Sequence, residues 1–232
     1  MAILGYKPSS EAKKLLANSK LLLLVGPTGS GEDTLEKRLL KTGSFKPIVT
    51  HTTRPPRENN GVLENDGDEY HFVTTALALN MLKEHKFVEA AYTHKYLYGT
   101  SIKEFEAAKR EGKIAVADID IKGVRSYRNL TAGVIAVFLL PPSFKVLIER
   151  LIKRYGKSHD QEDIKLRLAT ALDELSELLN TDYYHPIINN NIETTLNNVI
   201  DIARGVEKIK TDPKPLNLAK KLINEIQEYL VS

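Results

Sequence analysis

The sequence predicts an α/β fold with a mainly parallel sheet at its core. Short apolar runs alternate with longer segments of helical periodicity along most of the chain, as they do in proteins of this class. One such run, at residues 21–25, is followed by a glycine-rich turn and then by a helical segment. The chain has 232 residues, of which 42% are hydrophobic and 27% charged, so it can form one sizeable core with an inserted subdomain.

The expected strands are short apolar runs bounded by polar or turn-forming residues. They cover residues 21–25, 48–52, 70–73, 87–93, 114–119, 134–140 and 187–189. The expected helices carry apolar residues at helical spacing and cover residues 33–41, 76–85, 102–111, 143–154, 163–180 and 194–208. The segment 163–180 is the clearest of these, because its leucines form an apolar stripe. Gly43 fits the C-terminal cap of the first helix.

The remaining segments are irregular stretches and short flanking helices. Residues 55–68 are rich in proline, asparagine, glycine and charge, which is typical of a surface loop. Residues 155–161 are polar and lie between two helical segments, which suggests a mobile lid. Residues 211–215 contain two prolines and separate a last helix at 216–230 from the body. A further short helix is expected at residues 10–17.

Composition excludes several classes of site and partner. The chain has no cysteine, which excludes disulfides, thiolate metal ligands and cysteine nucleophiles. Its net charge of +3 is too small to indicate a nucleic-acid surface. The N-terminus lacks a signal pattern, and the longest apolar runs are too short to span a bilayer. We therefore expect a soluble, cytoplasmic protein that binds neither nucleic acid nor membrane.

A glycine-rich turn joins the first strand to the first helix and reads Gly-Pro-Thr-Gly-Ser-Gly-Glu-Asp-Thr at residues 26–34. This is the setting of a P-loop, G-x-x-x-x-G-K-[ST], in which backbone N–H groups and a helix N-terminus surround phosphate oxygens. Glu32 stands where the motif has lysine, and Asp33 stands where it has the Mg²⁺-binding hydroxyl. The candidate phosphate contacts are Gly26, Gly29, Ser30, Gly31, Glu32, Asp33 and Thr34.

Further polar motifs follow in a fixed order. They read T-T-R-P-P-R at residues 52–57, G-D-E-Y-H-F at 67–72, Y-G-T at 98–100 and D-I-D-I-K-G at 118–123. Arginines at 150, 154 and 167 bracket the expected lid. Taken singly, these arginines fit solvated surface, the tyrosines fit a core, and the aspartates fit helix caps. Their joint order, rather than any one of them, indicates a function.

Together these motifs resemble the guanylate kinase family, from about residue 20 to about residue 208. The resemblance implies the P-loop nucleoside monophosphate kinase fold, with a GMP-binding subdomain at about 55–100 and a helical lid at about 150–167. Residues 1–19 and 209–232 would be extensions. The implied activity is that of a transferase, which moves the γ-phosphoryl group of ATP to GMP with Mg²⁺ as cofactor. GMP and ATP are the expected ligands, and a homodimer is a further expectation.

The resemblance also assigns roles to individual residues. The GMP phosphate would be held by Thr50, Arg54, Arg57, Tyr70 and Tyr98, and guanine by Glu64, Glu89 and Thr100. Asp118 and Asp120 would orient GMP and the waters of Mg²⁺, while Arg150, Arg154 and Arg167 would clamp phosphates from the lid side. Carboxylates fit the guanine role independently, because two parallel donors distinguish guanine from adenine. Asp33 would bind Mg²⁺, and an insertion relative to the family is expected at residues 58–63.

Glu32 argues against full activity. A P-loop lysine supplies positive charge beside the β- and γ-phosphates, and a glutamate replaces this attraction by repulsion. A unit pair about 4 Å apart is worth roughly 4 kcal/mol at an effective dielectric of about 20, so the loss is large even after screening. We expect impaired phosphoryl transfer. A recent or engineered loss of the lysine, a compensating cation, and a GMP-binding role of another kind all stay open.

The alternative function is a catalytically inactive module of the same fold, which binds GMP or a protein partner. Guanylate-kinase-like modules of scaffold proteins usually follow other domains in longer chains. Here roughly twenty residues flank the expected core on either side, too few for another domain. The acceptor-site residues are also present, so we favour the nucleotide kinase.

Overall fold

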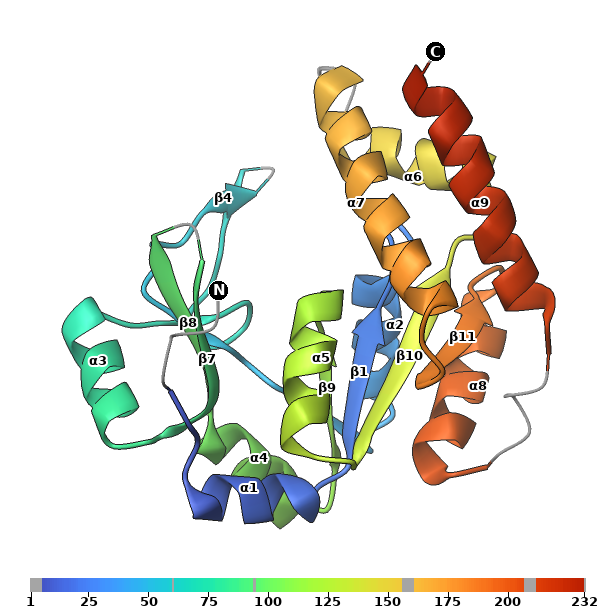
Figure 1. Ribbon diagram of the computed structural model, residues 1–232. Helices are drawn as coiled ribbons and strands as arrows, with labels where there is room; N and C mark the ends of the chain where they lie inside the picture. Colours follow the sequence, from blue (N-terminus) through green and yellow to red (C-terminus); the bar gives the residue numbers. More distant parts are fainter. Residues whose placement is uncertain (1–5, 60, 94, 156–160, 207–211, 232) are drawn as a thin grey trace. The chain divides into compact units, whose positions relative to one another are not determined.

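The structure is a computed structural model that describes residues 6–59, 61–93, 95–155, 161–206 and 212–231 (Figure 1). The chain forms two compact units. The first unit comprises residues 1–21, 43–117 and 126–134, and the second comprises residues 22–42, 118–125 and 135–232. Among the described helices, none has both the length and the apolar character that crossing a bilayer requires.

A five-stranded sheet has the strand order β11-β10-β1-β9-β2. Its strands are β1 (Leu21–Val25), β2 (Phe45–Pro47), β9 (Ile114–Asp118), β10 (Val134–Leu140) and β11 (Tyr184–Ile188). β10 and β11 pair in parallel, as do β2 and β9. All five residues of β1 are buried, which explains why this strand is a continuous apolar run rather than an alternating one. The predicted α/β class is therefore confirmed.

The helices of the second unit are mostly long and amphipathic. They are α2 (Glu32–Lys41), α6 (Phe144–Tyr155), α7 (Gln161–Leu179), α8 (Ile192–Arg204) and α9 (Lys214–Val231). Contacts join α2 with α8, and join α9 with both α6 and α7. Figure 1 shows α7 and α9 side by side. Leu222 and Ile226 of α9 are fully buried, so the last helix belongs to the packed core of this unit.

The first unit is built on a smaller sheet of order β6-β3-β8-β7. Its strands are β3 (His51–Thr52), β6 (His71–Phe72), β7 (Phe87–Thr93) and β8 (Tyr96–Ser101), and its helices are α1 (Ser10–Ala17), α3 (Thr75–Lys83) and α4 (Ile102–Arg110). β7 and β8 form an antiparallel hairpin. Phe87, Ala78 and Leu97 are buried together, with Tyr6 packed against them. Tyr6 also donates a hydrogen bond to the Phe87 carbonyl at 2.5 Å, which attaches the N-terminal segment to β7.

Several boundaries predicted from sequence are wrong, for identifiable reasons. The expected strand at 48–52 matches β3 at residues 51–52 alone, because the chain pairs with β9 at residues 45–47, before the expected start, and with β6 and β8 at residues 51–52. The surface loop at 55–68 contains a small hairpin of β4 (Glu58–Asn59) and β5 (Val62–Leu63), with Gly61 in the left-handed region. Most of the expected lid, residues 156–160, lies outside the described residues.

Two longer elements, β8 and α5 (Ile121–Leu130), were also missed. The first, Tyr-Leu-Tyr-Gly-Thr-Ser, mixes aromatic residues with glycine and hydroxyls, so it lacks an apolar run. The second contains Gly123 and several polar residues, and its start is fixed by a side-chain cap instead of by composition. Asp120 Oδ1 accepts a hydrogen bond from the Gly123 N–H at 2.7 Å.

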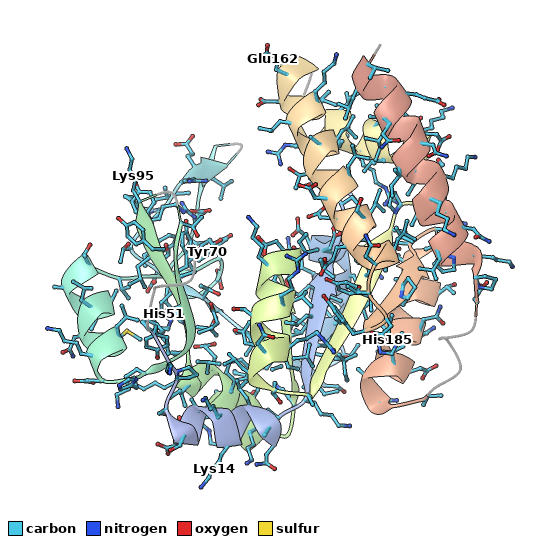
Figure 2. The ribbon with its side chains drawn as sticks, in the orientation of Figure 1. Lys14, His51, Tyr70, Lys95, Glu162 and His185 are labelled. Atoms are coloured by element: carbon cyan, nitrogen blue, oxygen red, sulfur yellow. The ribbon has the colours of Figure 1, made fainter. Side chains whose placement is uncertain are left out.

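His51 gives the first unit a titratable group with an incompletely satisfied side chain. Its ring lies 4.6 Å from that of His71 and meets Phe87 edge-on (labelled in Figure 2). Its Nδ1 is buried and has no hydrogen-bond partner within the described part of the chain. Burial, with help from His71 and against the opposing effect of Asp66, lowers the pKa of His51 from 6.5 to about 4.

We predict that His51 makes stability fall on acidification. Between pH 6.5 and about 4, His51 is protonated in the unfolded state but neutral in the folded state. The free energy of unfolding therefore decreases as the pH falls from 6.5 to about 4. The slope is at most about 1.4 kcal/mol per pH unit. Urea unfolding of wild type and His51→Leu at several pH values measures it. The variant should show the shallower loss below pH 6.5, and parallel curves would contradict the prediction.

Candidate functional site

The glycine-rich loop of the second unit connects the buried strand β1 to the first turn of α2. Gly29 and Gly31 have φ angles of 97° and 108°, a region that side-chain-bearing residues rarely adopt. Gly31 is required for a second reason, since a Cβ there would stand 2.5 Å from Asn189 Nδ2. The loop therefore has the tight shape that the motif predicts, with backbone N–H groups gathered at a helix N-terminus.

A side chain just after β11 and another from α6 fix the carbonyl groups of this loop. Asn189 Nδ2 donates to the Ser30 carbonyl at 2.7 Å, and Asn189 Oδ1 accepts from Thr195 Oγ1 at 3.1 Å. Arg150 Nη1 donates to the carbonyls of Gly29 at 3.0 Å and Ser30 at 3.3 Å. Asn189 was missed from the sequence. Its position just after a parallel strand was the available signal, because such positions border ligand sites in α/β sheets.

A cavity of about 570 Å³ opens beside the loop. It is lined by Gly29, Gly31, Glu32, Asp33, Thr34, Arg150, Asn189, Asn190 and Ile192. This volume falls within the range of small-molecule sites in proteins. Most residues predicted to contact nucleotide phosphates thus lie around one cavity.

Glu32 does not extend into solvent as a surface charge. The residue is 7% exposed, and its Oε2 accepts a hydrogen bond from the Gly31 N–H at 2.9 Å. Its Oε1 is buried without a hydrogen-bond partner among the described residues. Burial, reinforced by the charges of Asp118 and Asp33, raises the pKa of Glu32 to about 8. The repulsion expected from a fully ionised carboxylate is therefore reduced near neutral pH.

The two aspartates that were predicted to orient GMP and the waters of Mg²⁺ lie near the end of β9. Asp118 and Asp120 are exposed. Asp120 caps the N-terminus of α5, which is the structural role that the sequence offered as an alternative to a catalytic one. Glu174 of α7 is buried, and burial together with Asp120 raises its pKa to about 8; the sequence had not pointed to it. No group of three or more His, Cys, Asp or Glu residues in the described part of the chain could hold a metal by itself. Mg²⁺ commonly binds one or two carboxylates and completes its shell with phosphates and water, and Asp33 fits that requirement.

The predicted lid arginines differ in what the structure shows. Arg150 contacts the glycine-rich loop, as described above. Arg167 is half-buried on α7 and engages other groups of the protein. The Arg154 side chain lies outside the described residues. Of the three arginines, Arg150 is the one for which the described residues show a direct contact with the loop.

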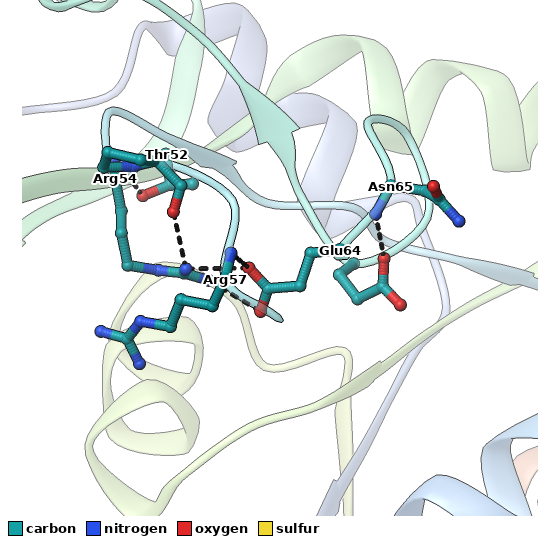
Figure 3. A network of polar contacts seen from close by, with 7 residues as sticks. Thr52, Arg54, Arg57, Glu64 and Asn65 are labelled. Carbon is teal, nitrogen blue, oxygen red and sulfur yellow. Dashed lines mark hydrogen bonds and ion pairs between the residues drawn. The ribbon is translucent and has the colours of Figure 1, made fainter. Parts of the chain in front are cut away.

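In the first unit, Arg54 and Glu64 form a buried ion pair (Figure 3). Arg54 Nη1 lies 2.8 Å from Glu64 Oε2, and Nη2 donates to Oε1 at 3.0 Å. Glu64 Oε2 also accepts from the Arg57 N–H at 2.8 Å. The hydrogen bond from Arg54 is the main reason why the pKa of the Glu64 carboxyl is lowered. Both oxygens of Glu64 are therefore already engaged within the protein.

Aromatic rings complete this cluster. The Arg54 guanidinium lies 5.1 Å from the centre of the Tyr70 ring, and Tyr98 is hydrogen-bonded to Arg54. The rings of Tyr70 and Tyr98 meet edge-to-face with centroids 5.9 Å apart. The structure thus brings together four of the residues predicted to serve the acceptor phosphate: Arg54, Arg57, Tyr70 and Tyr98.

Glu89 and Thr100 form a second polar pair on the adjoining hairpin. They face each other across β7 and β8, and Thr100 Oγ1 donates to Glu89 Oε1 at 2.8 Å. Thr50 Oγ1 lies 3.4 Å from Thr100 Oγ1, which places it in the same network. Tyr127 is buried and hydrogen-bonded to Thr100, and the sequence had given no sign of this contact. Three predicted residues therefore form one network.

Comparison with known proteins gives a consistent result. The family model described as guanylate kinase matches residues 18–205. Guanylate kinase 1 of Arabidopsis thaliana is 38% identical over 177 residues, which are 75% of this chain and 44% of that protein. Guanylate kinase 1 of Oryza sativa is 36% identical over 183 residues, which are 78% of this chain and 46% of that protein. This chain thus spans about half the length of these plant relatives.

A bacterial relative is covered more fully. The guanylate kinase of Methylobacillus flagellatus is 36% identical over 186 residues, which are 80% of this chain and 88% of that protein. Among solved structures, guanylate kinase from Anaplasma phagocytophilum aligns with a TM-score of 0.58 and 22% identity, covering 93% of this chain and 98% of that chain. At that identity the structural likeness shows the fold alone.

We predict that the Arg54–Glu64 pair is essential to the stability of the first unit. Glu64→Ala leaves Arg54, only 5% exposed, without its partner, and breaking a buried pair in this way costs about 3–5 kcal/mol. Urea unfolding measures the loss. Glu58→Ala, which removes an exposed carboxylate from β4, is the matched control and should change the free energy of unfolding little. Equal effects of the two substitutions would show that the ion pair contributes nothing.

Proposed function

Because the chain belongs to the guanylate kinase family, we propose that it transfers the γ-phosphoryl group of ATP to GMP, giving GDP and ADP. The observation that carries this proposal is the acceptor cluster of the first unit. A buried arginine, a second arginine and two tyrosines lie next to a carboxylate–hydroxyl pair, and this combination suits a nucleoside monophosphate. Purine nucleotide metabolism is the proposed setting.

Arg54 is the central group for binding the GMP phosphate in this proposal. A guanidinium donates through five N–H groups, so Arg54 can keep Glu64 and still bind a phosphate oxygen. The hydroxyls of Tyr70 and Tyr98 add donors close to the same guanidinium. Arg57 contributes a second positive charge from the exposed side of the loop.

Glu89 is the better candidate for reading guanine. Glu64 is held on both oxygens by Arg54 and the Arg57 backbone, and Glu89 Oε1 accepts a hydrogen bond from Thr100 Oγ1 on the adjoining hairpin. A carboxylate in that position can accept the guanine N1–H and N2–H groups, which adenine does not offer. We therefore assign Glu89 and Thr100 to the base, and Glu64 first to the positioning of Arg54.

The donor half of the reaction belongs to the glycine-rich loop. We propose that ATP phosphates bind at Gly29, Ser30 and Gly31, with Mg²⁺ held by Asp33 and the phosphates themselves. When bound, Mg²⁺ supplies charge neutralisation at the β- and γ-phosphates. Arg150 has donors beyond those it gives to the loop carbonyls and can turn them to a phosphate. Asp118 and Asp120 would orient GMP and the metal-bound waters.

A second candidate function is favoured by Glu32. The loop carries a buried carboxyl where the motif has a lysine, which would suit a module that binds GMP, or a protein partner, without catalysing phosphoryl transfer.

The cytoplasm is the proposed compartment, which the lack of cysteine supports. That nucleic acid and membranes are not partners stays a prediction, as do the homodimer and the division into extensions, GMP subdomain and lid.

Glu89 should decide the choice between GMP and AMP. We expect Glu89→Ala to weaken GMP binding by about 1–3 kcal/mol, the penalty for leaving guanine donors unpaired, and to leave AMP binding nearly unchanged. Isothermal titration calorimetry measures both ligands. Glu64→Gln is the comparison, since it disturbs Arg54 and should weaken GMP and AMP alike. Wild-type affinity that is equal for GMP and AMP would refute the assignment of guanine.

Restoring the lysine should raise activity strongly. We expect Glu32→Lys to increase kcat/KM for GMP plus ATP by at least about a hundredfold, which is roughly 2.7 kcal/mol in transition-state stabilisation. Glu36→Lys makes the same change of charge one turn further along α2 and serves as the matched control. A coupled assay for ADP measures the rates. If wild type already turns over at about 1–100 per second and Glu32→Lys changes nothing, another cation serves the phosphates.

A further inference from the structure

The carboxyl group of Glu32 is folded back into the loop that precedes it. Oε2 accepts the Gly31 N–H, although the two residues are neighbours in sequence. Oε1 lies 2.7 Å from the point where a Cβ on Gly26 would stand, at the opposite end of the motif. The carboxyl therefore reaches between the first and last glycines of the loop, and only the missing side chain of Gly26 leaves room for it.

This position is the one in which a P-loop holds its ligand. Such loops bind phosphate oxygens with backbone N–H groups, assisted by the positive end of the following helix. A carboxyl group offers two acceptor oxygens of the same kind, and here it already uses one loop N–H. An external phosphate and the Glu32 carboxyl thus require the same donors.

We propose that the Glu32 carboxyl group is an internal ligand that fills the phosphate-binding loop of this chain, so that an external polyphosphate binds only by displacing it. The inference rests on the proposed function for the identity of that polyphosphate as a nucleoside triphosphate. The contact between Glu32 and the loop does not depend on that function.

Further observations support a loop that is occupied by Glu32 and from which a ligand can displace the Glu32 side chain. The Asn189 and Arg150 hydrogen bonds hold the carbonyls of Ser30 and Gly29, so the loop keeps its shape without an external ligand. Ser30 Oγ is buried and, like Glu32 Oε1, lacks a hydrogen-bond partner in the described ranges, which leaves polar groups available to a ligand. Glu32 also lines the cavity of about 570 Å³, which offers space for its side chain once it leaves the loop.

Occupation of the loop by the Glu32 side chain and simple charge repulsion predict different effects of substitutions at Glu32 on the binding of phosphate. If Glu32 acts only through its charge, Glu32→Gln and Glu32→Ala remove the same obstacle and should have the same effect. If the side chain fills the loop, glutamine can keep the hydrogen bond from Gly31 because its amide oxygen is also an acceptor. Alanine cannot reach the loop donors and leaves them open.

The test uses inorganic tripolyphosphate as the probe, without Mg²⁺, and isothermal titration calorimetry on the full chain. We expect Glu32→Ala to bind tripolyphosphate at least about tenfold more tightly than Glu32→Gln, the effect of freeing about one hydrogen bond to a charged group. Glu36→Gln, which removes a carboxyl one turn along α2, is the charge control and should bind like wild type. Equal affinities of Glu32→Ala and Glu32→Gln would overturn the proposal.

Hydrogen exchange supplies a readout that does not depend on ligand binding. The Gly31 amide should exchange faster in Glu32→Ala than in wild type, with the amide of Leu35, bonded to the Gly31 carbonyl, as an internal reference for folding. Unchanged protection at Gly31 would also overturn the proposal. Tripolyphosphate has no nucleobase, and its binding involves no phosphoryl transfer. These results therefore hold whether or not the chain phosphorylates GMP. Failure of the GMP assay alone would count against the proposed function and not against the occupation of the loop by Glu32.

Discussion

The hydrogen bond from Asn189 to the Ser30 carbonyl is the contact on which the donor side of the molecule depends. It ties the end of β11 to the glycine-rich loop at 2.7 Å, and Thr195 holds the other end of the same amide. Gly31 must be a glycine because this amide approaches so closely. The positions of α2, of Glu32 and of the cavity beside them follow from a loop that is fixed from outside. A loop supported in this way keeps its shape whichever anion occupies it.

In the cluster proposed to bind GMP, an ion pair fixes the central side chain, as the Asn189 amide fixes the glycine-rich loop. Arg54 is buried, so it needs a partner, and Glu64 supplies it on both oxygens. Tyr70 and Tyr98 pack around the guanidinium and limit the directions in which it can donate. The arginine is thus held in place by the protein itself, and for the GMP phosphate proposed to bind there this would reduce the entropic cost of binding.

Sequence reasoning succeeded where a local pattern determines the outcome and failed where tertiary pairing does. β1, β7 and β10 agree with the expected ranges to the residue, because each is a mainly apolar run that ends where polar residues, glycine or proline begin. Residues 45–52 could not be divided correctly into two strands, since the division depends on which sheet each residue joins. The identity of the acceptor residues came from a resemblance. Their pairing, above all that of Glu64 with Arg54, is visible only in three dimensions.

The intact scaffold around Glu32 has a genetic consequence. Every glutamate codon becomes a lysine codon through a change of its first base alone. Gly29, Gly31 and Asn189 already give the loop the tight, externally supported turn that surrounds this position. A single base change at the Glu32 codon would therefore complete the P-loop motif up to its lysine within an existing loop.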